Sequence, residues 1–210
     1  MTADRTGSPW WRRLSPGLTL ALFVAAGLTA VTAVHQWARP HIAEAERQAV
    51  LARLEQVLPP GYDNDPPADA FVRPAPLAGA PPMTVYPAYR DGRPLGVAVE
   101  VETPRGYAGP IRLLVGIDAA GRVVAVRVAA HRETPGLGDV IDTRRSRWMD
   151  GFTGRTIGDP PAAAWRLTVD GGAFDAVTGA TVTTRAVVEA VREVLVDFHR
   201  AETVAPNDPR

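Results

Sequence analysis

The longest uninterrupted apolar stretch of the chain lies near its N-terminus, between Gly17 and Val34. It contains no charged residue, and a helix of this length, rising ~1.5 Å per residue, nearly spans a bilayer core of ~30 Å. A cleaved signal peptide is the alternative, but its apolar stretch is usually only ~7–15 residues long and ends in small residues. Here the bulky sequence His-Gln-Trp follows at residues 35–37. We therefore interpret residues 15–37 as a transmembrane anchor.

Arginines are distributed unevenly on the two sides of this anchor. Arg5, Arg12 and Arg13 precede it, whereas the arginines that follow it are offset by nearby glutamates. Flanking segments rich in Lys and Arg stay in the cytoplasm. The sequence thus predicts a cytoplasmic N-terminus over residues 1–14 and places the rest of the chain beyond the membrane. In a bacterium, this describes a single-pass protein of the inner membrane whose main domain is periplasmic.

The segment after the anchor changes from a helical pattern to a turn-rich composition. Apolar residues at helical spacing predict a helix over residues 42–58, which the sequence Pro-Pro-Gly at 59–61 ends. Residues 59–82 are rich in Pro, Ala and Asp and predict a loop. We group residues 38–82 as a helix and a connecting segment.

Alternation of apolar and polar residues then predicts a sheet. Val97, Val99 and Val101 alternate with small or acidic residues, and Asp91-Gly92 before them suits a tight hairpin turn. The same reasoning predicts strands at residues 111–117 and 122–130 and a final helix with an apolar stripe at residues 184–200. Strands that are grouped together and flanked by helices predict an α+β domain with a mixed or antiparallel sheet over residues 83–200, followed by a disordered tail at residues 201–210.

Composition narrows the chemistry available to this domain. The chain has 210 residues, a formal net charge of zero and no cluster of basic residues among aromatics, so we do not expect it to bind nucleic acid. It has no cysteine, which excludes disulfides, thiolate nucleophiles and cysteine-ligated clusters. Its four histidines lack the spacing of a metal site. Any redox chemistry must therefore come from an organic cofactor.

A cluster of hydroxyl side chains precedes the final helix. Four threonines, at positions 178, 181, 183 and 184, surround Gly179 and Ala180. If Thr181 lies in the turn before the helix, the helix N-terminus beside it would favour a phosphate. The alternative is that Thr183 or Thr184 simply caps the helix.

A second candidate segment, His131–Asp139, follows a predicted strand and has the sequence HRETPGLGD. Its prolines and glycines predict a rigid, exposed turn. Glu133 and Thr134 offer polar groups at its start, and Leu137 and Gly138 could form the edge of a site for a flat aromatic ligand. The alternative is an ordinary loop with Glu133 in solvent and with His131 as a surface or packing residue.

The order of these segments resembles a known family. The anchor is followed by GYAGPI at residues 106–111, a strand pair, ETPGLG at residues 133–138 and DGGAFDAVTGAT at residues 170–181. This order resembles RnfG (also called RsxG), the G subunit of the Rnf ion-translocating electron transport complex, which is related to NqrC. The resemblance extends over roughly residues 10–200.

The resemblance implies one FMN per chain, linked covalently through its phosphate to Thr181, with Thr178 in a supporting position. It also implies an ApbE-type flavin transferase that recognises the motif, including Asp175, and a flavin ring near residues 133–138. The chain would be an electron-carrier subunit that works with other Rnf subunits and is not catalytic on its own. Relatives often carry a basic residue shortly before the position of Asp170, whereas this chain has Thr168 and Val169. Two other functions remain open, a sensory or regulatory FMN-binding domain and a non-catalytic periplasmic binding protein.

Overall fold

The computed structural model describes residues 11–204, with side chains described from residue 17 to residue 201 except at positions 40, 41 and 43. The chain divides into two compact units, Met1–Ala49 and Val50–Arg210. Most of the predicted cytoplasmic segment, and the end of the predicted tail from residue 205 on, lie outside the described residues. Each unit is considered by itself below.

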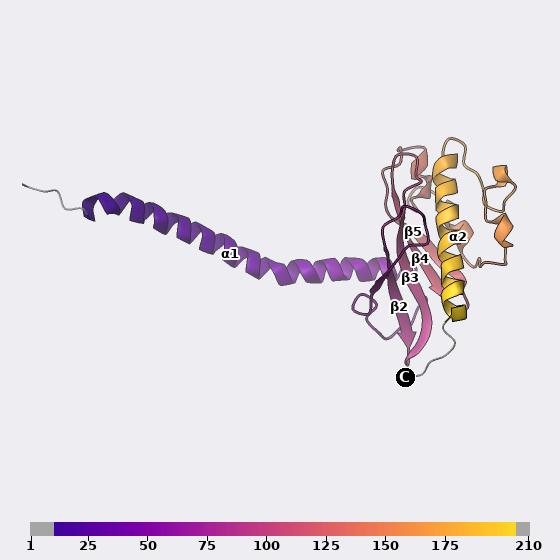
Figure 1. Cartoon of the computed structure of the whole chain (residues 1–210), viewed down its shortest axis with the longest axis horizontal. Helices are drawn as coiled ribbons and strands as arrows, with labels where there is room; N and C mark the ends of the chain where they lie inside the picture. The colour runs from indigo at the N-terminus through magenta and orange to yellow at the C-terminus, as the bar shows by residue number, and fades with distance from the viewer. Residues whose placement is uncertain (1–10, 205–210) are drawn as a thin grey trace, which may run out of the picture. The chain divides into compact units, whose positions relative to one another are not determined.

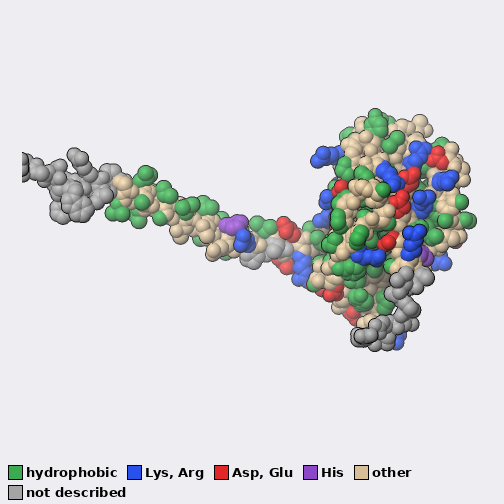
Figure 2. All heavy atoms as spheres, viewed as in Figure 1, with side chains coloured by type: hydrophobic (Ala, Val, Ile, Leu, Met, Phe, Trp, Pro, Cys, Tyr) green, Lys and Arg blue, Asp and Glu red, His purple; other side chains and the backbone are tan. Residues whose placement is uncertain are grey.

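A single long helix, α1 (Trp11–Leu54), contains the apolar stretch. Side chains from residue 17 to residue 37 are exposed, and the threonines inside the stretch bond to carbonyls one turn earlier, as Thr29 does to Ala25 O at 2.7 Å. Figure 2 shows hydrophobic side chains along this part of the helix, with charged and histidine side chains only further along. By length and composition, this helix could cross a membrane.

The helix predicted over residues 42–58 is not a separate element. It is the C-terminal part of α1, and it ends at Leu54, because a tight turn follows in which Val57 N and Leu58 N both donate to Leu54 O, at 3.0 and 2.8 Å. Leu54, Val57 and Leu58 are buried, so this turn belongs to the core of the second unit.

The second unit contains a five-stranded, fully antiparallel sheet in the order β1-β2-β3-β4-β5. Asp91 and Gly92, with φ of 50° and 70°, form the two-residue turn predicted between β2 and β3. The prediction of a loop throughout residues 59–82 is wrong at β1, whose residues gain hydrogen-bond partners only by pairing with β2. The strands are β1 (Phe71–Arg73), β2 (Met83–Arg90), β3 (Arg93–Thr103), β4 (Ile111–Asp118) and β5 (Val123–Ala130).

Both faces of this sheet are covered. One face packs against α2 (Thr181–Val204), which lies along the sheet in Figure 1. The buried residues of α2 match the predicted apolar stripe. The other face packs against the turn after α1 through Ala98 and Leu114. Gly116 on that face is pressed against Val57, because an added Cβ would lie 2.6 Å from the Val57 carbonyl carbon. Burial on both sides explains why β4 is almost continuously apolar.

Four short 3-10 helices connect β5 to α2 and hold the segment before α2 in place. They are η1 (Gly138–Ile141), η2 (Trp148–Phe152), η3 (Ala162–Ala164) and η4 (Thr168–Asp170). Phe152, Trp165 and Phe174 pack together, with the Phe152 and Phe174 rings stacked at 4.8 Å between centroids. Trp148 Nε1 donates to Asp175 O at 2.8 Å. The motif that leads into α2 is thus anchored to the core on its N-terminal side.

Candidate functional site

The helix α2 begins at Thr181, directly after a turn that only glycine adopts easily. Gly179 has φ of 83°, in the left-handed region, and an added Cβ would lie 3.0 Å from Leu137 Cδ2. Ala180 is buried, and its N–H donates to Val177 O. The small residues at 179 and 180 therefore bring the helix N-terminus close to the loop that contains Leu137.

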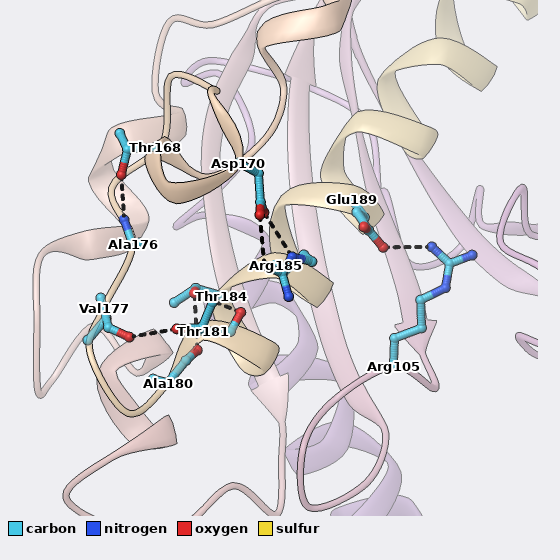
Figure 3. Close-up of polar contacts among 10 residues, drawn as sticks. All are labelled: Arg105, Thr168, Asp170, Ala176, Val177, Ala180, Thr181, Thr184, Arg185 and Glu189. Carbon is cyan, nitrogen blue, oxygen red and sulfur yellow. Dashed lines mark hydrogen bonds and ion pairs between the residues drawn. The ribbon is translucent and has the colours of Figure 1, made fainter.

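The hydroxyl of Thr181 is only weakly held by the protein. It donates to Val177 O at 3.4 Å, which is long for a hydrogen bond between oxygens. Figure 3 shows this contact at the start of α2. The side chain is partly exposed and lines a pocket, so its oxygen is accessible to a reagent.

The prediction that Thr183 or Thr184 caps the helix is wrong, because α2 begins before them. Both are buried in its first turn. The Thr184 hydroxyl donates to Ala180 O at 3.0 Å and to Thr181 O at 3.3 Å (Figure 3), and that of Thr183 donates to Glu133 Oε2 at 2.5 Å. In these contacts both hydroxyls act as donors, whereas an N-cap side chain accepts a hydrogen bond from a backbone N–H.

The loop after β5 forms the predicted tight turn. Leu137 N and Gly138 N donate to Thr134 O at 3.2 and 3.0 Å, and Gly136 has φ of 80°. Leu137 is 50% exposed. As predicted, this loop presents an apolar edge to solvent.

This loop and the start of α2 form the walls of one pocket of about 470 Å³. Seven predicted site residues line it, whereas Asp175 and Thr178 are exposed and do not. The lining residues are Tyr107, Glu133, Thr134, Leu137, Gly138, Gly179, Ala180, Thr181, Val182 and Thr183.

The alternative expectation for Glu133, a loop residue in solvent, is wrong. Only 4% of its surface is exposed, so it is not a solvated loop residue, and both carboxylate oxygens already accept hydrogen bonds. His131 lies beside it, with Nδ1 accepting from Glu133 N at 3.1 Å. This local bond agrees with a packing role for His131.

Two apolar residues of the pocket, Tyr107 and Val182, were not predicted as site residues. Tyr107 is 72% exposed and Val182 46% exposed. Tyr107 lies in the turn between β3 and β4, which the sequence identified only as a turn. An exposed aromatic residue between two closely spaced glycines was the signal that could have revealed it.

An ion pair fixes the segment before the threonine cluster. Arg185 of α2 donates to both carboxylate oxygens of Asp170, at 2.9 and 3.0 Å, and this hydrogen bonding lowers the pKa of Asp170 (Figure 3). The Thr168 hydroxyl accepts a hydrogen bond from Ala176 N at 3.2 Å. The positive charges beside Asp170 therefore come from Arg185 of the helix and from Arg166, which precedes η4.

Comparisons with known proteins identify the family of this chain. The family described as FMN-binding domain matches residues 106–196. The G subunit of the ion-translocating oxidoreductase complex of Pseudomonas aeruginosa is 44% identical over 201 residues, which cover 93% of this chain and 94% of that protein. The chain belongs to this family of G subunits. The corresponding protein of Vibrio cholerae is 43% identical over 197 residues, covering 92% of this chain and 93% of that one.

The match to the FMN-binding domain family contains the whole pocket. It begins at the turn that holds Tyr107 and ends within α2, and all ten lining residues lie inside it. The structure is also similar to the crystal structure of Shewanella oneidensis NqrC, with 26% sequence identity and a TM-score of 0.46, covering 58% of this chain and 62% of that one. The pocket therefore lies within the part of this G-subunit family member that matches the FMN-binding domain family.

Proposed function

We propose that this subunit carries one FMN, joined by a phosphoester to Oγ1 of Thr181, and passes electrons within a membrane complex that couples electron transfer to ion translocation. The observation that carries this proposal is the position of Thr181. Its weakly bonded hydroxyl lies at the first residue of α2 and in the wall of a pocket within the region that matches the FMN-binding domain family.

The residues around the pocket fit the two ends of such a cofactor. The N-terminus of α2, a helix of 24 residues, offers backbone N–H groups and a partial positive charge to a phosphate on Thr181. Leu137, Tyr107 and Val182 supply exposed apolar surface for a flat ring. The pocket volume of about 470 Å³ lies within the ~300–1,000 Å³ usual for small-molecule sites.

Each wall of the pocket has a distinct task in this proposal. FMN, when bound, supplies the electron chemistry, and the protein supplies position and electrostatics. Leu137 covers one side of the ring, and the exposed Thr134 offers a hydroxyl to its polar edge. Gly179 and Ala180 carry little or no side chain, which leaves the backbone before Thr181 open to the approach of the ring and the phosphate.

Attachment requires a second protein, for which we propose a flavin transferase of the ApbE type. Asp175 and Thr178 lie outside the pocket and are exposed. We assign them to recognition by the transferase and to support of the turn, respectively. A phosphoester tether keeps the cofactor with the protein outside the cytoplasm, where FMN is not made.

We further propose a place for this domain in the cell. The helix α1 anchors the chain in the inner membrane through residues 15–37, with residues 1–14 in the cytoplasm and the flavin domain in the periplasm. The arginine bias on the N-terminal side of the apolar stretch supports this orientation. The other subunits of the complex are then its partners in electron transfer.

Thr181→Ala tests the attachment. The full-length protein is produced together with its transferase, denatured and examined for flavin fluorescence on a gel, and the labelled peptide is then located by mass. We expect fluorescence in the wild type and in Thr184→Ala, and none in Thr181→Ala. Thr184→Ala is the matched control, since it removes a hydroxyl from the same helical turn without touching the pocket. A fluorescent Thr181→Ala band, or an adduct on another threonine, would refute the assignment.

A further inference from the structure

Glu133 is the only buried ionisable side chain among those that the structure describes. Its Oε1 accepts a hydrogen bond from Ala108 N at 3.1 Å, and its Oε2 accepts one from the Thr183 hydroxyl at 2.5 Å. These partners belong to different segments, the turn between β3 and β4 and the first turn of α2. One carboxylate therefore connects all three segments that line the pocket.

Two glycines lie close to this carboxylate. An added Cβ at Gly106 would lie 2.8 Å from Glu133 Oε1, and one at Gly138 would lie 2.8 Å from Oε2. Real Cβ atoms do not approach other atoms so closely without displacing them. The absence of a side chain at these two positions therefore gives the carboxylate the space that it occupies between the turn and the loop.

The contacts of Glu133 indicate that it positions parts of the protein and does not bind a ligand directly. Each of its oxygens already accepts a hydrogen bond from the protein, and only 4% of the residue is exposed. A buried carboxylate is retained when donors and a helix N-terminus compensate for its desolvation. Thr183, in the first turn of α2, places it at such a terminus.

We propose that Glu133 and Thr183 form a positioning pair that fixes the loop of Leu137 relative to Thr181, and with it the orientation of the flavin. Thr183 is two residues from Thr181, and Leu137 is four residues from Glu133. The hydrogen bond between the pair therefore joins the attachment point to the wall that covers the ring. This inference rests on the proposed function, since it concerns a flavin held on Thr181.

Two matched valine variants test the bond. Thr183→Val removes the hydroxyl that reaches Glu133 and keeps the shape of the side chain, and Thr184→Val makes the same change one residue later. The Thr184 hydroxyl is equally buried but bonds only to carbonyls at the start of its own helix. Full-length protein with FMN attached is compared by visible circular dichroism and by flavin reduction potential. We expect Thr183→Val to keep FMN on Thr181 but lose the wild-type dichroism and shift the potential, and Thr184→Val to retain both.

Two substitutions of Glu133 separate geometry from charge. In Glu133→Gln, the amide oxygen can accept from Ala108 N and the amide nitrogen can donate to Thr183 Oγ1, so the connection survives without the charge. In Glu133→Asp the charge survives, but the side chain is one methylene too short to reach both partners. We expect Glu133→Gln to retain the wild-type dichroism and Glu133→Asp to lose it.

Several outcomes would overturn the inference. It is wrong if Thr183→Val and Thr184→Val have the same dichroism and potential, or if Glu133→Gln is changed as much as Glu133→Asp. Far-ultraviolet circular dichroism checks that each variant folds, and if Thr183→Val does not fold, the comparison of the two Glu133 variants decides. Absence of FMN from Thr181 in the wild type would refute the proposed function itself, whereas FMN on Thr181 with unaltered variants would refute only the positioning pair.

Discussion

Replacing Gly138 by alanine should destabilise the domain, because the methyl group has nowhere to go. Its Cβ would lie 2.7 Å from Glu133 Cβ, 2.8 Å from Glu133 Oε2 and 3.2 Å from Thr183 Oγ1. The first of these contacts is with the stem of Glu133, which moves only with its backbone. Gly138 does not have a positive φ, so alanine brings no backbone strain of its own. The loss of stability in Gly138→Ala therefore measures how tightly the atoms around the Glu133 carboxylate are packed.

The size of the effect follows from two contributions. Forcing an extra carbon into a packed site costs typically ~1–3 kcal/mol. Loss of a hydrogen bond to a charged, buried group costs about 1.5–3 kcal/mol. With partial relaxation, we expect a loss of about 3 kcal/mol in the free energy of unfolding, which lowers the Tm of a domain of this size by roughly 6–12 °C.

Thermal unfolding of the full-length protein in detergent, followed by far-ultraviolet circular dichroism, measures this loss. Gly151→Ala is the matched control, because Gly151 also lies in a 3-10 helix, has no positive φ and has nothing within 4 Å of an added Cβ. We expect the control to unfold at the wild-type temperature. Equal Tm values for Gly138→Ala and Gly151→Ala would show that the contact with Glu133 is not tight, and the reasoning would fail.

Three other predictions concern the loop, acid stability and topology. Leu137→Asp should keep the covalent flavin but shift its spectrum or potential, and an unchanged flavin would mean that the ring lies elsewhere. Hydrogen bonds from Arg144 lower the pKa of Asp142 from 3.8 to about 2, so the stability that the ionised carboxylate contributes is present above pH 4 and disappears as the pH falls to 2. In Asp142→Asn, the free energy of unfolding should lose less between pH 4 and pH 2 than it does in the wild type. An equal loss in the two proteins would contradict this prediction. Alkaline phosphatase fused after Arg210 should be active, whereas activity of a cytoplasmic-type reporter at that position would reverse the proposed orientation.

The parts of the fold that sequence could predict depend on local patterns. Alternation around Val97, Val99 and Val101 identified a strand because the period of a strand is a local property. The turn at Asp91-Gly92 was predictable because its backbone requires residues that tolerate positive φ. The apolar stripe of α2 was likewise visible in the spacing of its residues. Each of these patterns can be recognised from a few neighbouring residues alone.

The features that the sequence did not predict depend on residues that are far apart in the chain or on the exact start of a helix. The burial of Glu133 follows only from its hydrogen bonds with Ala108 and Thr183, which lie 25 and 50 positions away in the sequence. Thr183 and Thr184 looked like caps because the start of α2 was expected three residues too late. β1 was missed because a three-residue strand has no periodicity and is defined by its pairing with β2.

The helix α2 has consequences for how an electron carrier of this kind can move. Its first residue is Thr181, and from Ala186 to Leu195 most of its residues are fully buried in the main core. Amides in such a helix are expected to exchange with solvent only when the domain unfolds as a whole. If FMN is attached to Thr181 as proposed, its attachment point is part of this helix, in contrast to a group on a flexible loop. That point can then change its distance from a donor or acceptor only through displacement of the entire domain or of its partner.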